Sequence, residues 1–218
     1  MKTRIKICCI SSLEEAQIAI HAGADALGLV GRMPSGPGPI EDALIEKIAR
    51  KIPPPIASFL LTSEQSAKGI IEHIKRVHTN TVQIVDELNE GTYQQIREAL
   101  PAVRLVQVIH VQDDNCIQQA IALEPTVDAL LLDSGNPKAS IKTLGGTGNV
   151  HNWQISKKII RSVNIPVFLA GGLHAGNVKE AIAEVKPFGV DVCSGVRTDG
   201  QLDPNKLKDF MRAVKTCE

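Results

Sequence analysis

Short apolar runs alternate with amphipathic segments from one end of the chain to the other. Eight runs of four to seven residues are rich in Val, Ile and Leu, which predicts β-strands. Several are apolar at almost every position, as in Ala-Leu-Leu-Leu at 129–132, which is typical of parallel strands covered on both faces. The predicted strands are Ile5–Ile10, Ala26–Val30, Ile56–Leu61, Thr81–Val85, Leu105–Val111, Ala129–Asp133, Val167–Ala170 and Val190–Ser194.

The segments between these runs repeat apolar residues at helical spacing. The first segment follows Ser11 and Ser12, whose hydroxyls can cap a helix, and it stops at Gly23, a residue type common just after a helix. The next segment stops at three consecutive prolines, which cannot continue a helix. The predicted helices cover 13–20, Ile40–Ile52, Glu64–Val77, Thr92–Leu100, Asn115–Leu123, Trp153–Val163, Asn177–Val185 and Asn205–Val214.

Eight strand–helix units without a break in composition predict an α/β fold in one domain spanning residues 1–218. Two architectures can carry this pattern: a closed (β/α)8 barrel, the TIM barrel, and an open doubly wound sheet. So many regular units in 218 residues favour the closed barrel, because an open sheet of this size usually has fewer strands and a marked edge. In such a barrel the functional site is built at the carboxyl ends of the strands.

Charge and composition exclude several classes of function. Basic and acidic residues both number 24, no basic run stands out, and aromatic residues make up only 3%, so no nucleic-acid partner is expected. No apolar run approaches the roughly 20 residues that span a bilayer, and the N-terminus lacks a signal-peptide core, so we expect a cytoplasmic protein without a membrane partner. Five scattered cysteines without C-x-x-C spacing argue against a disulfide framework and against a structural metal site.

Two glycine-containing turns close the last two predicted strands and are candidates for binding phosphate. Gly171 and Gly172 follow one strand, and Ser194 and Gly195 lie at the end of the other. Glycines let backbone N–H groups approach an anion, a following short helix can add its positive end, and a phosphate site at these two strand ends recurs in barrels. Glycines that merely allow tight turns are the alternative. Two such turns at matching strand ends favour phosphate.

Other residues with suitable chemistry lie where a barrel would hold its substrate. Asp133 ends a run of four apolar residues, although the turn-forming residues 134–137 also fit a turn or cap role for it. The glycine-rich stretch that contains Gly146 can fold over a ligand. Cys8 ends the first predicted strand, where a thiol can transfer protons, and Lys6 on the same face can lower its pKa. A thiol that is simply buried is the alternative for Cys8.

At these positions the sequence resembles the phosphoribosylanthranilate isomerase family of tryptophan biosynthesis. The matching segments occur with the family's order and spacing from the first predicted strand to the last, so the resemblance covers essentially the whole chain. They are Lys6-Ile7-Cys8, Gly23-Ala24-Asp25-Ala26-Leu27-Gly28, Leu132-Asp133-Ser134, Gly145-Gly146-Thr147-Gly148 with Trp153, Leu169-Ala170-Gly171-Gly172-Leu173, Asn177-Val178, Ala181-Ile182 and Val190-Asp191-Val192-Cys193-Ser194-Gly195-Val196.

This resemblance implies a barrel enzyme that works without cofactor or metal. The reaction would be the Amadori-type rearrangement of N-(5-phosphoribosyl)anthranilate to 1-(o-carboxyphenylamino)-1-deoxyribulose 5-phosphate. Cys8 matches the family's general base and Asp133 its general acid. The turns at Gly171-Gly172 and Ser194-Gly195 would hold the ribose phosphate, and Lys6 and Gly146 are further candidates for contact with the substrate.

The chain departs from the family where the rest of the substrate would bind. Gly38 stands where family members carry an arginine that grips the anthranilate carboxylate, and glycine cannot make that bidentate contact. Cys9 replaces a glycine, and Arg197 replaces a glutamate. Arg32 and Arg197 are the candidates for a replacement cation. A solvated surface arginine is the alternative for each.

Three functions therefore stay open at the level of sequence. The first is phosphoribosylanthranilate isomerase activity with a substituted carboxylate grip, and the second is a related isomerase or lyase acting on a different sugar phosphate. The third is a non-catalytic sugar-phosphate-binding protein, against which the presence of both Cys8 and Asp133 argues. Each predicts a small phosphorylated sugar as the partner and fits a monomer or a homodimer.

Overall fold

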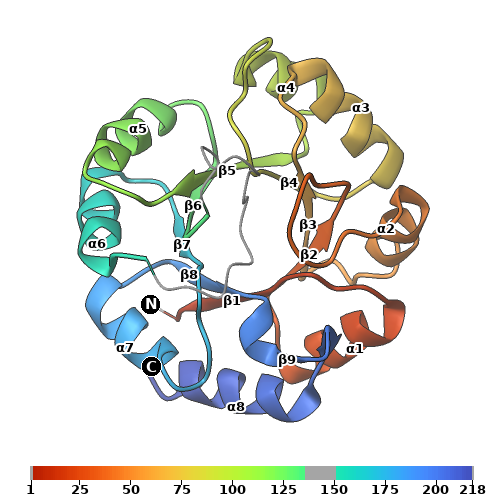
Figure 1. Ribbon diagram of the computed structural model, residues 1–218. Helices are drawn as coiled ribbons and strands as arrows, with labels where there is room; N and C mark the ends of the chain where they lie inside the picture. Colours follow the sequence, from red (N-terminus) through yellow and green to blue (C-terminus); the bar gives the residue numbers. More distant parts are fainter. Residues whose placement is uncertain (1, 136–150, 218) are drawn as a thin grey trace.

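Eight parallel strands form a closed barrel in chain order, and eight helices of the described residues surround it (Figure 1). The computed structural model describes residues 2–135 and 151–217. The predicted closed barrel is confirmed, and the open sheet is ruled out because β8 pairs with β1. The strands are β1 (Arg4–Ile7), β2 (Ala26–Val30), β3 (Ala57–Thr62), β4 (Thr81–Ile84), β5 (Arg104–His110), β6 (Ala129–Asp133), β7 (Val167–Leu169) and β8 (Gly189–Val192).

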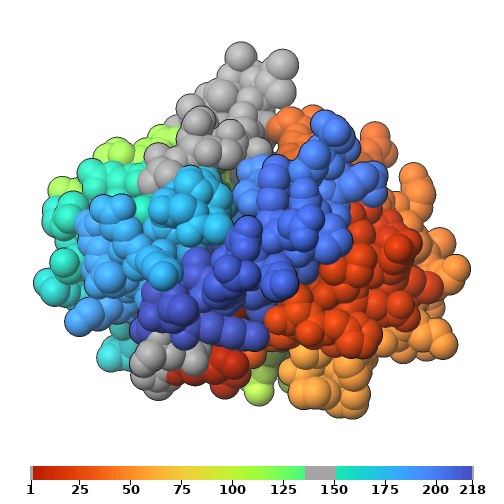
Figure 2. Space-filling view, turned by 90° about the horizontal axis from the view of Figure 1, so that it is seen from below, coloured from red at the N-terminus to blue at the C-terminus, as the bar shows by residue number. Residues whose placement is uncertain are grey.

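The helices follow the strands at almost the positions that the sequence predicts. Ser12 caps the first of them by accepting a hydrogen bond from the backbone N–H of Glu15 at 3.0 Å, and Gly23 ends it with a φ of 100°. Figure 2 shows the face where helices from the two ends of the chain meet, with α8 between α7 and α1. The helices are α1 (Leu13–Ala22), α2 (Asp42–Ala49), α3 (Ala67–Val77), α4 (Tyr93–Ala99), α5 (Asn115–Leu123), α6 (Trp153–Ser162), α7 (Val178–Val185) and α8 (Pro204–Lys215).

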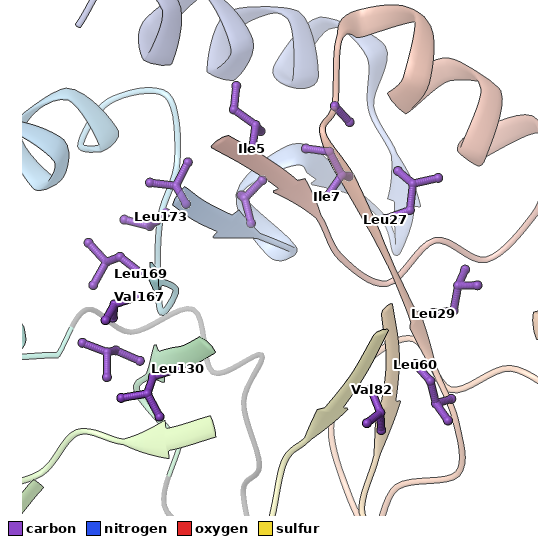
Figure 3. Packing of buried hydrophobic residues seen from close by; sticks show 14 of the residues in the cluster. Ile5, Ile7, Leu27, Leu29, Leu60, Val82, Leu130, Val167, Leu169 and Leu173 are labelled. Atoms are coloured by element: carbon purple, nitrogen blue, oxygen red, sulfur yellow. The ribbon is translucent and has the colours of Figure 1, made fainter. Parts of the chain in front are cut away.

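The hydrophobic core has two layers, because alternate residues of each strand point to opposite faces of the sheet. Ile5 and Ile7 belong to the layer between strands and helices, part of which Figure 3 shows. Lys6 and Cys8 point the other way, into the barrel, where apolar side chains fill most of the interior. Among them are Ala26, Val30, Phe59, Leu61, Val106, Val108, Leu131 and Phe168. The alternation in β1 thus directs both Lys6 and Cys8 toward the barrel axis.

Carboxylates join neighbouring strands at the amino-terminal end of the barrel. Asp25, just before β2, accepts a hydrogen bond from the backbone N–H of Ile5 at 2.9 Å and pairs with Arg4 at 3.0 Å. Asp128, just before β6, accepts from the backbone N–H of Leu105 at 2.8 Å. Each contact fixes the start of one strand against the start of the next. Polar groups are therefore structural at this end of the barrel.

The structure differs from the sequence prediction around the ends of β1 and β8. Both strands are shorter than predicted, because Cys9 has a φ of 61° and Cys193 has φ −121° and ψ −86°, values at which a strand cannot continue. The short helix expected after β8 is one 3-10 turn, Ser194–Val196. A small hairpin, β9 (Arg197–Thr198) and β10 (Gln201–Leu202), follows it and was not predicted. In the two described ranges, no helix is long and apolar enough to cross a membrane.

Candidate active site

A cavity at the carboxyl ends of the strands brings together residues that are far apart in the sequence. Its wall includes five of the residues predicted for the site, from β1, β6, β7 and the turn after β8. They are Cys8, Asp133, Gly171, Gly172 and Ser194. The loop after β2 folds back to close one side of this wall, with a backbone hydrogen bond of 2.9 Å from Ile40 to Val30. The cavity lies where a (β/α)8 barrel places its substrate.

Cys8 is buried in this wall at the end of β1, with 5% of its surface exposed. Its backbone N–H donates to the carbonyl of Val192 at 2.8 Å, which fixes the residue against β8. A hydrogen bond with the Cys9 thiol lowers the pKa of Cys8, burial opposes that change, and the positive charge of Lys6 adds to the lowering. The arrangement favours the thiolate, the form of cysteine that acts as a base.

Lys6 lies beneath Cys8 and is fully buried. Its Nζ pairs with Asp191 Oδ2 at 2.9 Å. Burial alone would lower the pKa of Lys6, but the charge of Asp191 together with that of Cys8 outweighs burial and raises the pKa, so the ammonium is retained. Lys6 does not form part of the cavity wall. The structure thus places it as a support for Cys8 and Asp191, where the sequence had predicted contact with the substrate.

Gly28 provides the space that this buried charge cluster needs. A Cβ atom at Gly28 would lie 2.8 Å from Cys8 Sγ and 3.0 Å from Lys6 Nζ, closer than atoms can pack. The side chains of Cys8 and Lys6 therefore both lie over Gly28. Any side chain at this position would push the thiol or the ammonium out of place.

Asp133 is the last residue of β6 and is part of the wall. Its Oδ1 accepts a hydrogen bond of 2.7 Å from the backbone N–H of Ser134. Burial raises the pKa of Asp133, although this hydrogen bond and the charge of His110 act in the opposite direction. A carboxyl group with a raised pKa can keep its proton near neutral pH and donate it to a substrate.

The turn after β7 presents two glycines in the left-handed region, with φ values of 81° at Gly171 and 62° at Gly172. Among the described residues, neither backbone N–H has an acceptor. Asn177 holds the turn in place by donating from Nδ2 to the carbonyl of Gly172 at 2.9 Å. Two N–H groups without acceptors in a glycine turn can bind an anion.

The two residues of the second predicted phosphate turn have different roles. Ser194 is part of the cavity wall, whereas Gly195 is not. A Cβ atom at Gly195 would lie 2.0 Å from the carbonyl oxygen of Leu173, so only glycine lets the turn after β8 pack against the turn after β7. Gly195 therefore sets the distance between the two turns, while Ser194 faces the cavity.

The structure does not place Arg197 where the sequence prediction expected it. Its guanidinium makes two hydrogen bonds of 3.0 Å to the Glu15 carboxylate, and only 7% of its side chain is exposed. It also donates to the backbone carbonyls of Cys8 and Cys9. Arg197 is absent from the cavity wall and fixes the loop after β1 from behind. Its partner is a carboxylate of the protein itself.

The other predicted residues lie outside the cavity wall or outside the described residues. Arg32 is exposed and lines a separate hollow with Pro39 and Glu41, outside the cavity wall. Gly146 lies outside the described residues. Among the described residues of the wall there is no Lys or Arg. Neither Arg32 nor Arg197, the two cations that the sequence analysis considered, is part of the cavity wall.

Gly38 and Cys9, two departures from the family pattern, are in contact with each other. A Cβ atom at Gly38 would lie 2.7 Å from Cys9 Cβ and 3.0 Å from Cys9 Sγ. The φ of Gly38 is 85°, in the left-handed region. The side chain of Cys9 thus occupies the space that a residue larger than glycine would need at position 38.

The sequence analysis missed two polar residues that the strands contribute to the wall. Gln83 on β4 and Asp191 on β8 both face the cavity and are at least 93% buried. Within residues 2–135 and 151–217, Oε1 of Gln83 and Oδ1 of Asp191 have no hydrogen-bond partner. Two buried acceptors without donors indicate that a ligand with hydroxyl or N–H groups would complete the site. The available signal was a polar residue at an inward position of an otherwise apolar strand.

Comparison with known proteins gives consistent matches along the chain. A model of the N-(5'-phosphoribosyl)anthranilate (PRA) isomerase family matches residues 5–213. The N-(5'-phosphoribosyl)anthranilate isomerase 2 of Methanosarcina mazei is 37% identical over 215 residues, which are 97% of this chain and 91% of that protein.

Solved structures agree with this match. The phosphoribosyl anthranilate isomerase of Thermotoga maritima has a TM-score of 0.81 and 26% identity, covering 98% of this chain and 99% of that one. A second such structure, in complex with reduced 1-(o-carboxyphenylamino)-1-deoxyribulose 5-phosphate, has a TM-score of 0.77 and 24% identity, with coverage of 98% and 99%. At 24% identity, this second match shows a similar fold only.

Proposed function

The chain belongs to the N-(5'-phosphoribosyl)anthranilate isomerase family, and from that premise we propose that it isomerises N-(5-phosphoribosyl)anthranilate with Cys8 as general base and Asp133 as general acid. The observation that supports these roles is that the pKa values of two residues in one cavity wall are shifted in opposite directions. The pKa of Cys8 is lowered, chiefly by its hydrogen bond with Cys9, and the pKa of Asp133 is raised by burial. The two shifts bring the pKa values of the thiol and the carboxyl group closer together, which favours a deprotonated base beside a protonated acid.

The proposed reaction begins at Asp133. Its carboxyl group donates a proton to the ribose ring oxygen, the bond between C1 and that oxygen breaks, and C1 forms an iminium with the amino nitrogen. The Cys8 thiolate then removes the proton from C2. The electron pair of that C–H bond forms a C1–C2 double bond, and the C–N π electrons return to nitrogen. The resulting enol becomes the ketone when C1 gains a proton and the C2 hydroxyl loses one.

Recognition of the substrate would be divided between the two sides of the cavity. The N–H groups of Gly171 and Gly172, which have no acceptor among the described residues, support a phosphate site there together with Ser194 in the neighbouring turn. Oε1 of Gln83 and Oδ1 of Asp191, which have no partner in the part of the chain that the structure describes, are suited to accept hydrogen bonds from the sugar hydroxyls or the amino group. Apolar residues from β2, β3 and the loop after β2, among them Met33, form the remaining side. An aromatic ring fits that side.

The test is turnover by purified enzyme, together with rescue of a tryptophan auxotroph that lacks this isomerase. Cys8→Ala and Asp133→Asn should each lower kcat by about 100-fold or more, the usual effect of losing a general base or acid. Cys217→Ala serves as the matched control, because Cys217 is exposed and lies after α8, and it should rescue like the wild type. Failure of the soluble wild-type protein to turn over the substrate would disprove the proposal.

One observation favours a second candidate, an isomerase for a sugar phosphate without a carboxylated aglycone. The described part of the wall contains no Lys or Arg to bind a carboxylate. The two candidates differ in their response to the aniline analogue that lacks the carboxylate. An enzyme specific for anthranilate should show a much lower kcat/KM for this analogue, whereas equal values would favour the second candidate.

A further inference from the structure

Two thiols touch at the mouth of the cavity, beside the proposed base. Sγ of Cys193, at the end of β8, lies 2.6 Å from Sγ of Cys9, in the loop after β1. Both residues are part of the cavity wall, next to Cys8 and Ser194. They are 184 positions apart in the sequence, so only the closed barrel brings them together.

The backbone at Cys9 adds an independent argument. Its φ of 61° lies in the left-handed region, which disfavours any residue with a Cβ atom and which glycine adopts freely. Strained residues of this kind cluster at functional sites. The thiol of Cys9 is therefore held against Cys193 at a position where glycine would fit without strain.

We propose that Cys9 and Cys193 are a modification site, which a small-molecule disulfide converts reversibly into an internal disulfide bond that inhibits the enzyme. Cys193 is partly exposed and Cys9 is buried, so Cys193 reacts first. Hydrogen bonds with Cys193 and Cys8, together with burial, raise the pKa of the Cys9 thiol, so Cys9 reacts after Cys193 and loses its proton as it attacks. The covalent step does not depend on the proposed function, whereas the inhibition does.

The chemistry proceeds through two exchange reactions. The Cys193 thiolate attacks one sulfur of the small disulfide R–S–S–R, a mixed disulfide forms, and one thiolate R–S⁻ leaves. The Cys9 thiolate then attacks Sγ of Cys193 and displaces the second R–S⁻. The two protons that the protein thiols lose convert both leaving groups to R–SH. The small disulfide is reduced, the two cysteines are oxidised, and an excess of small thiol reverses both steps.

Oxidation would change the surroundings of Cys8 without consuming its thiol. The hydrogen bond with the Cys9 thiol is the largest influence that lowers the pKa of Cys8. A Cys9 sulfur in a disulfide has no S–H to donate, so a smaller fraction of Cys8 would be thiolate at neutral pH. The new bond would also tie the loop after β1 to the turn that carries Ser194.

The experiment treats the full chain with excess glutathione disulfide under native conditions. Peptide mapping should then show a link between the segments that contain Cys9 and Cys193. The kcat/KM should fall roughly tenfold or more, as expected when a hydrogen bond to a charged group is lost. Dithiothreitol should restore both the free thiols and the activity.

Variants identify the pair, because Cys8 and Cys9 are neighbours in one peptide. The link should form in Cys8→Ala and in the control Cys116→Ser/Cys217→Ser, and it should be absent in Cys9→Ser and Cys193→Ser. For these last two variants, the ratio of oxidised to reduced activity should be one, whatever their basal rate. A link that needs Cys8, or thiols that stay free in excess glutathione disulfide, would overturn the proposal. A link without loss of activity would overturn only the inhibition.

Discussion

At the scale of single residues, contacts between side chains limit which single substitutions this site can accept. The Cys9 side chain lies against Gly38, and both residues have a positive φ. A side chain at position 38 would meet the Cys9 thiol, and a side chain at position 9 excludes one at position 38. The two departures from the family pattern are thus one coupled change.

This coupling leads to a prediction for an arginine at position 38. Gly38→Arg alone should destabilise the protein by about 2 kcal/mol or more, from left-handed strain together with overlap with Cys9. Cys9→Gly should remove the overlap, so the double variant should be more stable than the sum of the single effects predicts. Urea unfolding of the four proteins measures this difference. Strict additivity would show that the two side chains do not compete for space.

Lys6 provides a second prediction at this scale, on the pH dependence of the Cys8 thiol. Lys6 contributes to lowering the pKa of Cys8, so Lys6→Met should raise that pKa. Because the thiolate is the deprotonated form, the rise of alkylation rate with pH should move to higher pH, and the acidic limb of kcat/KM should move with it. Lys68→Met, at an exposed position of α3, is the control and should leave both profiles unchanged. An unshifted alkylation profile in Lys6→Met would contradict this role.

Much of the candidate site follows from sequence at the residue scale. Cys8, Asp133 and Gly171 each come at or just after the end of an apolar strand, and the ends of parallel strands meet at one edge. Arg197 could not be placed in this way. Its partner, Glu15, is 182 positions away, and nothing in the local pattern shows that the pair is buried.

At the scale of elements, the unpredicted hairpin depends on that same pair. Glu15 Oε1 accepts a hydrogen bond of 2.8 Å from the backbone N–H of Leu202, and Arg197 Nη1 donates to the carbonyl of Gly200 at 2.8 Å. The pair therefore joins α1, the loop after β1 and the β9–β10 hairpin. Strands of two residues have too few positions to show an alternating pattern, so no sequence signal predicts them.

The energetic role of this junction can be measured. Arg197→Met leaves the Glu15 carboxylate buried without its cation, so it should lower the free energy of unfolding by about 3 kcal/mol. Arg50→Met removes an exposed pair with Glu46 on α2 and should cost less than about 1 kcal/mol. Chemical denaturation of both variants gives the comparison. Equal effects would show that burial does not distinguish the two pairs.

At the scale of the whole molecule, the regular alternation of strands and helices was enough to predict the barrel. Ala26–Val30 and Ala129–Asp133 have the bounds that the pattern indicates. The register between the first and last strands could not be predicted from the sequence. It depends on pairs such as Arg4 with Gly189, which are far apart along the chain and leave no local pattern. The cavity depends on this register, since it places Cys8 beside Val192.

The pairing of β1 with β8 also has a consequence during synthesis. β1 leaves the ribosome well before Gly189–Val192, the residues that complete its pairing, because most of the barrel lies between them in the sequence. Until they emerge, one side of β1 presents backbone N–H and C=O groups with no strand to bind. A nascent chain of this protein therefore has an open edge while the segment between β1 and β8 is synthesised, and during that interval chaperones would have the most to protect.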